Sequence, residues 1–250
     1  MSDIPYSMPS MSPSYPEPPF LYRGGNVLIC VYRAGAEAIN SVVPEPLKPA
    51  EGNLVYAWIN DFNIVGFTHY HEAVISVPVE FQRKEGTYMA YLFLDNDSAI
   101  VAGREIWGFP KKEGHFTSLR EANFITRSVD KGGVEILRIS MEMTRTGTPA
   151  ALSGLGNPIY NLKVIPSVRK GAPPDVKQLT ATTFQNVVVH RVIEGKATVG
   201  LSPTGPLSLL APLEVIGGFY CELDFDLTYG EVAYDYLAGM PQPEFATACF

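Results

Sequence analysis

Residues Gly103 to Gly114 read G-R-E-I-W-G-F-P-K-K-E-G, and this stretch places two adjacent lysines directly after an aromatic residue and a proline. Lysine side chains normally lie solvated at a protein surface. Lys111 and Lys112 instead follow Trp107 and Phe109, in a part of the chain that is poor in charge. The pair is therefore either a solubility device on an edge strand or a reactive amine held in an apolar pocket.

A lysine becomes a good nucleophile only when its pKa falls, because a pKa near about 10.4 leaves almost all of it protonated at neutral pH. Burial lowers this pKa, and so does a nearby like charge. Two ammonium groups about 6 Å apart repel by roughly 3 kcal/mol at an effective dielectric of about 20, which corresponds to about two pKa units. On an extended segment the two side chains point to opposite faces, so burial must provide most of the shift for the inward lysine. Such an amine condenses with a ketone to give an iminium, an electron sink that supports decarboxylation, aldol and dehydration chemistry.

Short apolar and β-branched runs between turn residues dominate the chain on both sides of this motif. They predict strands over 26–32, 54–59, 72–81, 87–94, 114–121, 123–129, 134–143, 160–165, 176–184, 187–192, 215–226 and 230–236. Short helices are predicted over 34–43 and 99–106, the second capped by polar residues 95–98, and 202–213 is predicted to be a loop or a short helical excursion. About ten strands must either close or leave adhesive edges. We therefore predict a mainly β fold, an antiparallel closed β-barrel or cone with a few short helices.

The first nineteen residues contain six prolines and no apolar core. This composition predicts an extended N-terminal arm over 1–19, either a disordered tail or an arm laid over a neighbouring subunit. Residues 20–250 are expected to form a single domain, because no linker divides them.

The bulk composition excludes several classes of partner. A net charge of −7 gives no basic stripe for nucleic acid, and no apolar run is long enough to span a membrane. The three cysteines form no C-x-x-C pair, so neither a disulfide framework nor a zinc site is predicted, and a cytoplasmic setting fits. Charged residues make up only 18% of the chain, which favours subunit contacts.

The motif at 103–112 resembles the signature that surrounds the Schiff-base lysine of the acetoacetate decarboxylase family. The resemblance continues in V-V-P-E-P-L at 42–47, L-D-N at 94–96, N-L-K-V-I-P at 161–166 and Y-D-Y-L at 234–237. It covers roughly residues 20–238 and therefore supports the predicted β fold.

This resemblance implies the catalytic roles. Lys111 is expected to form the Schiff base, Lys112 to help lower its pKa, and Glu72 to be the active-site glutamate. Activation of a lysine by burial or by a cationic neighbour is already established for that family. No cofactor is implied, because the lysine itself supplies the electron sink. Together with the low charge fraction, the resemblance implies a higher homo-oligomer.

Around these three residues we expect a substrate-binding set. Trp107 and Phe109 are expected to form apolar walls, and Arg104 with Glu105 either an ion pair that positions the loop or a direct substrate contact. The full set is Arg23, Tyr70, Arg104, Glu105, Trp107 and Phe109. His69 and His71 share strand parity, but without a third ligand no metal site is predicted.

Two positions depart from the family pattern. Family decarboxylases carry an arginine where this chain has Gly25, and a glutamate that we place at Ala57; Arg23 is a possible substitute for the arginine. We predict a decarboxylase of acetoacetate or a related β-keto acid, acting through a lysine Schiff base. One alternative is a Schiff-base aldolase or dehydratase for pyruvate-like carbonyl compounds, and the other is a β-barrel that binds a small ligand without turning it over.

Overall fold

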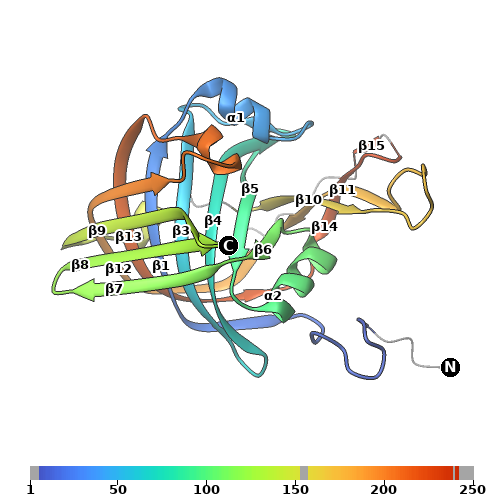
Figure 1. Cartoon of the computed structure of the whole chain (residues 1–250), viewed down its shortest axis with the longest axis horizontal. Helices are drawn as coiled ribbons and strands as arrows, with labels where there is room; N and C mark the ends of the chain where they lie inside the picture. Colours follow the sequence, from blue (N-terminus) through green and yellow to red (C-terminus); the bar gives the residue numbers. More distant parts are fainter. Residues whose placement is uncertain (1–5, 153–156, 239, 242–250) are drawn as a thin grey trace.

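A computed structural model describes residues 6–152, 157–238 and 240–241, and a single 15-stranded sheet carries most of them (Figure 1). The helical elements are short: α1 (Ala36–Val42), α2 (Asp97–Ala102), the π-helical turn η1 (Gly103–Trp107), and the 3-10 turns η2 (Pro149–Leu152) and η3 (Pro206–Leu210). The strands are β1 (Phe20–Arg33), β2 (Lys48–Pro49), β3 (Leu54–Ile64), β4 (Thr68–Phe81), β5 (Lys84–Leu94), β6 (Lys111–Glu113), β7 (His115–Glu121), β8 (Phe124–Lys131), β9 (Val134–Thr146), β10 (Ile159–Ile165), β11 (Val176–Thr182), β12 (Phe184–Leu201), β13 (Glu214–Leu227), β14 (Glu231–Asp235) and β15 (Met240–Pro241). The predicted mainly β fold with few short helices is confirmed.

The hydrogen-bonded strands form a path with two ends. Its order is β15-β14-β11-β10-β5-β4-β3-β1-β13-β12-β9-β8-β7, with β2 added to β4 and β6 to β5. Within the described residues, β7 and β15 end the path on opposite sides of the molecule, so the predicted closure into a barrel or cone is not confirmed (Figure 1). Almost every residue of β7 is exposed, and its charged side chains discourage further strand pairing.

The central strands bury both of their faces, because successive side chains alternate between two cores. On β4, Ala73 and Ile75 join a core that Ile39 of α1 and Ile139 of β9 also enter. Val74, between them, points into a second core on the other face of the sheet. This second core surrounds the cavity described below.

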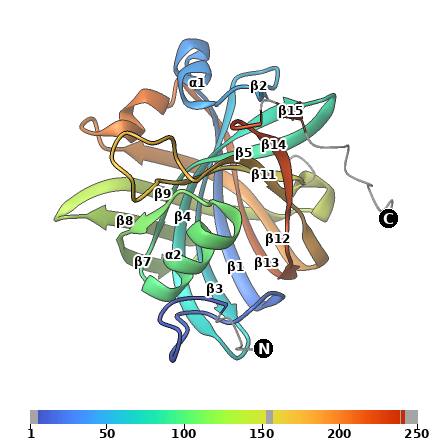
Figure 2. The same cartoon turned by 90° about the vertical axis from the view of Figure 1, so that its right-hand side faces the viewer.

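The segment from α2 to β6 carries the lysine motif to the edge of β5. Asn96 caps α2, its side chain accepting a hydrogen bond of 2.9 Å from the backbone N–H of Ala99. The predicted helix over 99–106 is α-helical only to Ala102 and continues as η1. β6 then pairs in parallel with β5, Lys111 opposite Leu92, and α2 lies beside these two strands (Figures 1 and 2).

The described part of the N-terminal arm, residues 6–19, packs against its own chain. The Tyr15 side chain is buried in the second core, and its hydroxyl donates a hydrogen bond of 2.5 Å to Glu105 Oε2. The arm therefore covers η1 instead of projecting from the domain. None of the described helices is long and apolar enough to cross a membrane.

Candidate active site

A cavity of about 400 Å³ lies within the second core, on one face of the sheet. Its wall is made mostly of apolar side chains from β1, β3, β4, β5, β12 and β13. Lys111, Glu72 and Tyr70 supply polar groups to this wall. The site therefore forms where the neighbouring strands β4, β5 and β6 meet the cavity.

Lys111 is the buried member of the lysine pair. Its side chain is only 6% exposed, and its Nζ lies 3.4 Å from Glu72 Oε2. Gly103 gives this side chain room, because a Cβ there would lie 2.6 Å from Lys111 Cδ and Cε. Burial lowers the pKa of Lys111, and the neighbouring Glu72 carboxylate partly opposes that shift.

Glu72 is shifted in the complementary direction. Burial raises the pKa of its carboxyl group, while Lys111 and a hydrogen bond from Asn60 partly restrain the rise. Burial thus opposes charge on both groups, while the contact between them opposes both shifts. The pair places an amine and a carboxyl group 3.4 Å apart at the cavity wall.

The lysine amine also lies among aromatic rings. Its Nζ is 5.3 Å from the centre of the Tyr70 ring and 5.4 Å from that of Phe109. The hydroxyl groups of Tyr70 and Tyr22 are 3.0 Å apart in a hydrogen bond. Phe109 and Tyr70 therefore lie at the cavity, where the sequence places them.

Lys112 lies on the opposite face of β6 and is exposed. The extended geometry of β6 separates the two lysines as alternation requires. Burial, not this neighbour, is the cause of the lowered Lys111 pKa. The expected help from Lys112 has no geometric support here.

Arg23 and Trp107 do not line the cavity. Arg23 pairs with Asp226 at 2.7 Å, so its guanidinium is already satisfied away from the lysine. Trp107 is buried in the second core, and its indole N–H donates to the Thr228 carbonyl at 2.9 Å. Trp107 supports the wall from behind, because Phe109, two residues later, takes the inward position.

Arg104 and Glu105 also lie outside the cavity wall, and no ion pair between them is seen in the described part of the chain. Adjacent residues on a helical turn point in different directions. Arg104 is exposed and donates to the backbone carbonyl of Lys111 at 3.2 Å, whereas Glu105 accepts from Tyr15. Both hydrogen bonds hold the loop around the lysine, and neither Arg104 nor Glu105 lines the cavity.

Three cavity residues on β3 escape prediction from sequence: Trp58, Asn60 and Phe62. The strand alternation over 54–64 marks them as one face, but only the register with β4 shows which face meets Glu72. Ala57, where we place the family glutamate, points into the other core and not into the cavity. The next residue, Trp58, lies on the cavity face instead. The Trp58 indole nitrogen is buried without a hydrogen-bond partner among the described residues.

Gly25 is covered by an aromatic ring. A Cβ at this position would lie 2.8 Å from Phe62 Cδ1. The space that a side chain at position 25 would enter is therefore filled by the apolar ring of Phe62.

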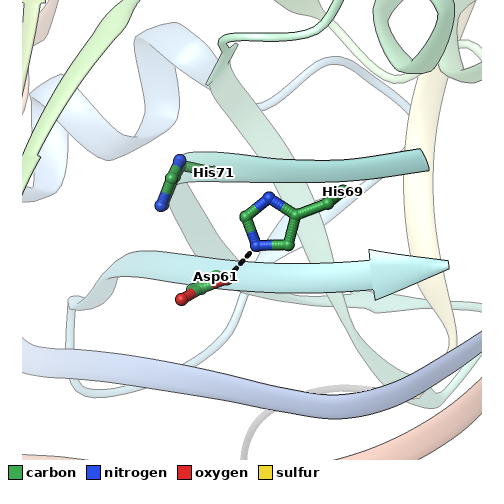
Figure 3. A group of neighbouring side chains, drawn as sticks. All are labelled: Asp61, His69 and His71. Carbon is green, nitrogen blue, oxygen red and sulfur yellow. Dashed lines mark hydrogen bonds and ion pairs between the residues drawn. The ribbon is translucent and has the colours of Figure 1, made fainter.

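A separate group on the other face of the sheet joins Asp61, His69 and His71 (Figure 3). Their possible ligand atoms lie within 4.8 Å of one another, so these residues could hold a metal ion. His69 Nε2 contacts Asp61 Oδ1 at 2.7 Å, and His71 Nδ1 contacts Asp95 Oδ2 at 2.7 Å. Asp61 is the third possible ligand beside the two histidines. It lies on β3 opposite His71, so the sequence of β4 alone does not reveal it. The group faces away from Lys111 and takes no part in the cavity.

Comparison with known proteins gives a consistent result. The family model for acetoacetate decarboxylase (ADC) matches residues 3–237. Acetoacetate decarboxylase 1 of Bradyrhizobium diazoefficiens is 32% identical over 237 residues, covering 93% of this chain and 94% of its own length. Acetoacetate decarboxylase of Burkholderia multivorans is also 32% identical and covers 93% and 96% of the two chains.

Solved structures share the fold. The crystal structure of acetoacetate decarboxylase from Legionella pneumophila superposes with a TM-score of 0.85 at 27% identity, covering 93% of this chain and 94% of that one. The enduracididine biosynthesis enzyme MppR, solved with pyruvate, gives a TM-score of 0.83 at 20% identity over 94% of this chain and all of its own, which shows a common fold only. With the motif, the buried lysine and this match along nearly its whole length, the chain belongs to the acetoacetate decarboxylase family.

Proposed function

We propose that this protein decarboxylates a β-keto acid through a Schiff base on Lys111. The observation that carries the proposal is the buried Lys111–Glu72 pair, with 3.4 Å between Nζ and Oε2, at the wall of a mainly apolar cavity. Family membership supports the same reaction class, because the relatives are named as decarboxylases of a β-keto acid.

The reaction begins with attack of the neutral Lys111 amine on the substrate ketone. The resulting carbinolamine loses water and becomes an iminium ion. The bond to the carboxylate then breaks, its electron pair passes to the iminium nitrogen, and CO₂ leaves an enamine. Protonation of the enamine carbon regenerates an iminium, and addition of water releases the ketone and the free lysine.

Glu72 is placed to move the protons that these steps require. In its protonated form it can donate to the departing hydroxyl group of the carbinolamine; after regaining a proton from solvent it can donate to the enamine carbon. The apolar walls disfavour the carboxylate of the bound substrate, and the loss of CO₂ removes that charge from the cavity.

Borohydride trapping tests the proposal. Incubation of the full chain with acetoacetate or another β-keto acid and borohydride should leave a mass adduct on Lys111, together with CO₂ release when borohydride is omitted. Lys111→Met should lose both signals, and Lys112→Met should keep them. Adduct formation without CO₂ would instead identify aldol-type chemistry, and no adduct with any carbonyl compound would contradict the Schiff base.

A further inference from the structure

The cavity extends well beyond the reacting groups. Lys111 lies on β6 beside β5, whereas β12 and β13 are separated from β5 in the sheet by β4, β3 and β1. All of these strands except β6 contribute apolar side chains to one continuous cavity. A small molecule bound to Lys111 and Glu72 would therefore contact only part of the cavity wall.

That distant wall is apolar. Val187 and Val189 of β12 and Leu223 of β13 line it. Val187 is 48% exposed despite lying at the cavity, so part of this apolar surface has no covering within the described chain. A ligand that covers such a surface gains hydrophobic binding energy.

The described cavity wall offers little positive charge to a substrate carboxylate. Among the described residues of the wall, Lys111 is the sole cationic side chain, and its nitrogen is consumed in the Schiff base. Glu72 is acidic, Arg23 is paired with Asp226, and Phe62 fills the space above Gly25. Because no free cation of the described wall pairs with the carboxylate, we expect much of the affinity to come from the uncharged part of the substrate, beside neutral donors such as the unpartnered Trp58 indole N–H.

The size of the cavity also favours a substrate larger than acetoacetate. A volume of about 400 Å³ falls within the range, roughly 300–1,000 Å³, of pockets that enclose drug-sized ligands. A four-carbon acid such as acetoacetate fills only a small part of it.

We infer that the cavity takes a β-keto acid whose ketone carries an apolar chain or ring larger than methyl, directed from Lys111 toward Val187, Val189 and Leu223. This inference rests on the proposed Schiff-base function and specifies its substrate class. The ketone carbon reacts at Lys111 as described above, and the apolar group supplies the affinity that a cation would otherwise provide.

A substrate series tests this choice with the full chain. The values of kcat/KM for CO₂ release are compared among β-keto acids that carry methyl, propyl, pentyl or phenyl on the ketone. Each methylene that becomes buried is expected to raise kcat/KM about fourfold, which corresponds to about 0.8 kcal/mol. The propyl compound should therefore exceed acetoacetate at least about tenfold.

Variants of the distant wall locate the apolar group. Leu223→Trp should lower kcat/KM for the pentyl and phenyl compounds at least about tenfold more than for acetoacetate. Leu223→Ala, which removes volume, serves if the first variant does not fold, and it should weaken the preference for the longer chains. Leu119→Trp is the matched control, because Leu119 is exposed on β7 away from the cavity, and it should leave all the ratios unchanged.

The outcomes separate the two proposals. If acetoacetate forms the Lys111 adduct and is turned over as fast as or faster than the longer substrates, the inference is wrong and the Schiff-base function stands. If Leu223→Trp reduces all substrates equally, the assignment of the distant wall is wrong. If no compound in the series gives an adduct or CO₂, the proposed function fails and the inference fails with it.

Discussion

At the scale of single residues, the Lys111 side chain can lie where it does because Gly103 has no side chain. Gly103 sits at the start of η1, directly against the Lys111 side chain, and any Cβ there would meet Lys111 Cδ and Cε at 2.6 Å and Nζ at 3.0 Å. The end of a lysine side chain is flexible, so it would move instead of breaking the fold. The glycine that opens the motif is thus a condition for where the amine lies.

Gly103→Ala should therefore impair the reaction more than the stability. A displacement of a reacting group by about 1 Å can cost roughly 100-fold in rate, so we expect a loss of that order in kcat for CO₂ release. The melting temperature should change by only a few degrees, because the clash is with a flexible side chain.

Gly147→Ala is the matched control for this change. Its added Cβ would meet the Glu194 side chain at 2.7 Å and Val192 Cγ1 at 2.9 Å, a side-chain clash of similar closeness at a glycine that does not line the cavity. This control should keep full activity. Full activity in Gly103→Ala as well would show that the glycine does not set the position of the lysine.

At the scale of elements, the end of η1, which leads into β6, is held by side chains from two strands. Lys163 of β10 donates to the Ile106 carbonyl at 3.1 Å, and Thr180 of β11 donates to the Trp107 carbonyl at 2.5 Å. These bonds satisfy carbonyl groups that the end of a helix leaves free. Gly108 then reverses the chain with a φ of 78°, which favours glycine.

Gly108→Ala should destabilise the protein through this element. The new Cβ would lie 2.5 Å from Lys163 Cβ and 2.6 Å from its Cα, so β10 itself must shift. Together with the unfavourable φ, we expect a loss of at least about 2 kcal/mol in the free energy of unfolding. Thermal or urea denaturation measures this loss.

Gly132→Ala separates the two causes. Gly132 has a φ of 63° but nothing within 4 Å of its added Cβ, so this variant carries the backbone cost without the collision. It should lose clearly less stability than Gly108→Ala. Equal losses in the two variants would show that packing against Lys163 contributes nothing.

At the scale of the whole molecule, local patterns predict the strands but not how the sheet is completed. Alternation and turn residues mark most strands correctly, but β6, which separates Lys111 from Lys112, is not among the predicted strands. Closure depends on pairing between strands that are distant in sequence, and it is not confirmed. β12 likewise runs unbroken from Phe184 to Leu201, although only 176–184 and 187–192 carry a clear apolar signal.

In the candidate site, too, the local sequence predicts some residues, and the pairing of strands decides the others. The motif identifies Lys111, and family resemblance adds Glu72, but Trp58 and Asn60 depend on the register of β3 against β4. Arg104 and Glu105 are close to the lysine in sequence, yet η1 turns them away from the cavity. Proximity in sequence is a weak guide wherever a helical turn leads into a strand.

The whole fold also sets the chemistry of the amine, because many strands together exclude water from Lys111. Burial lowers the Lys111 pKa, and Lys112 lies exposed on the other side of β6. A lowered pKa means that the reactive neutral amine is present at a lower pH than for an ordinary lysine, and is lost as the pH falls through the shifted value.

The most direct test is the pKa of Lys111 in the Lys112→Met variant. The rate at which an acylating reagent labels Lys111 is followed by mass spectrometry across a pH series, in the unmodified protein and in the variant. We predict that Lys111 titrates below the ordinary lysine value, and that removal of Lys112 leaves its lowered pKa almost unchanged. A return of the Lys111 pKa in the variant to about 10.4, the ordinary value for lysine, would contradict activation by burial.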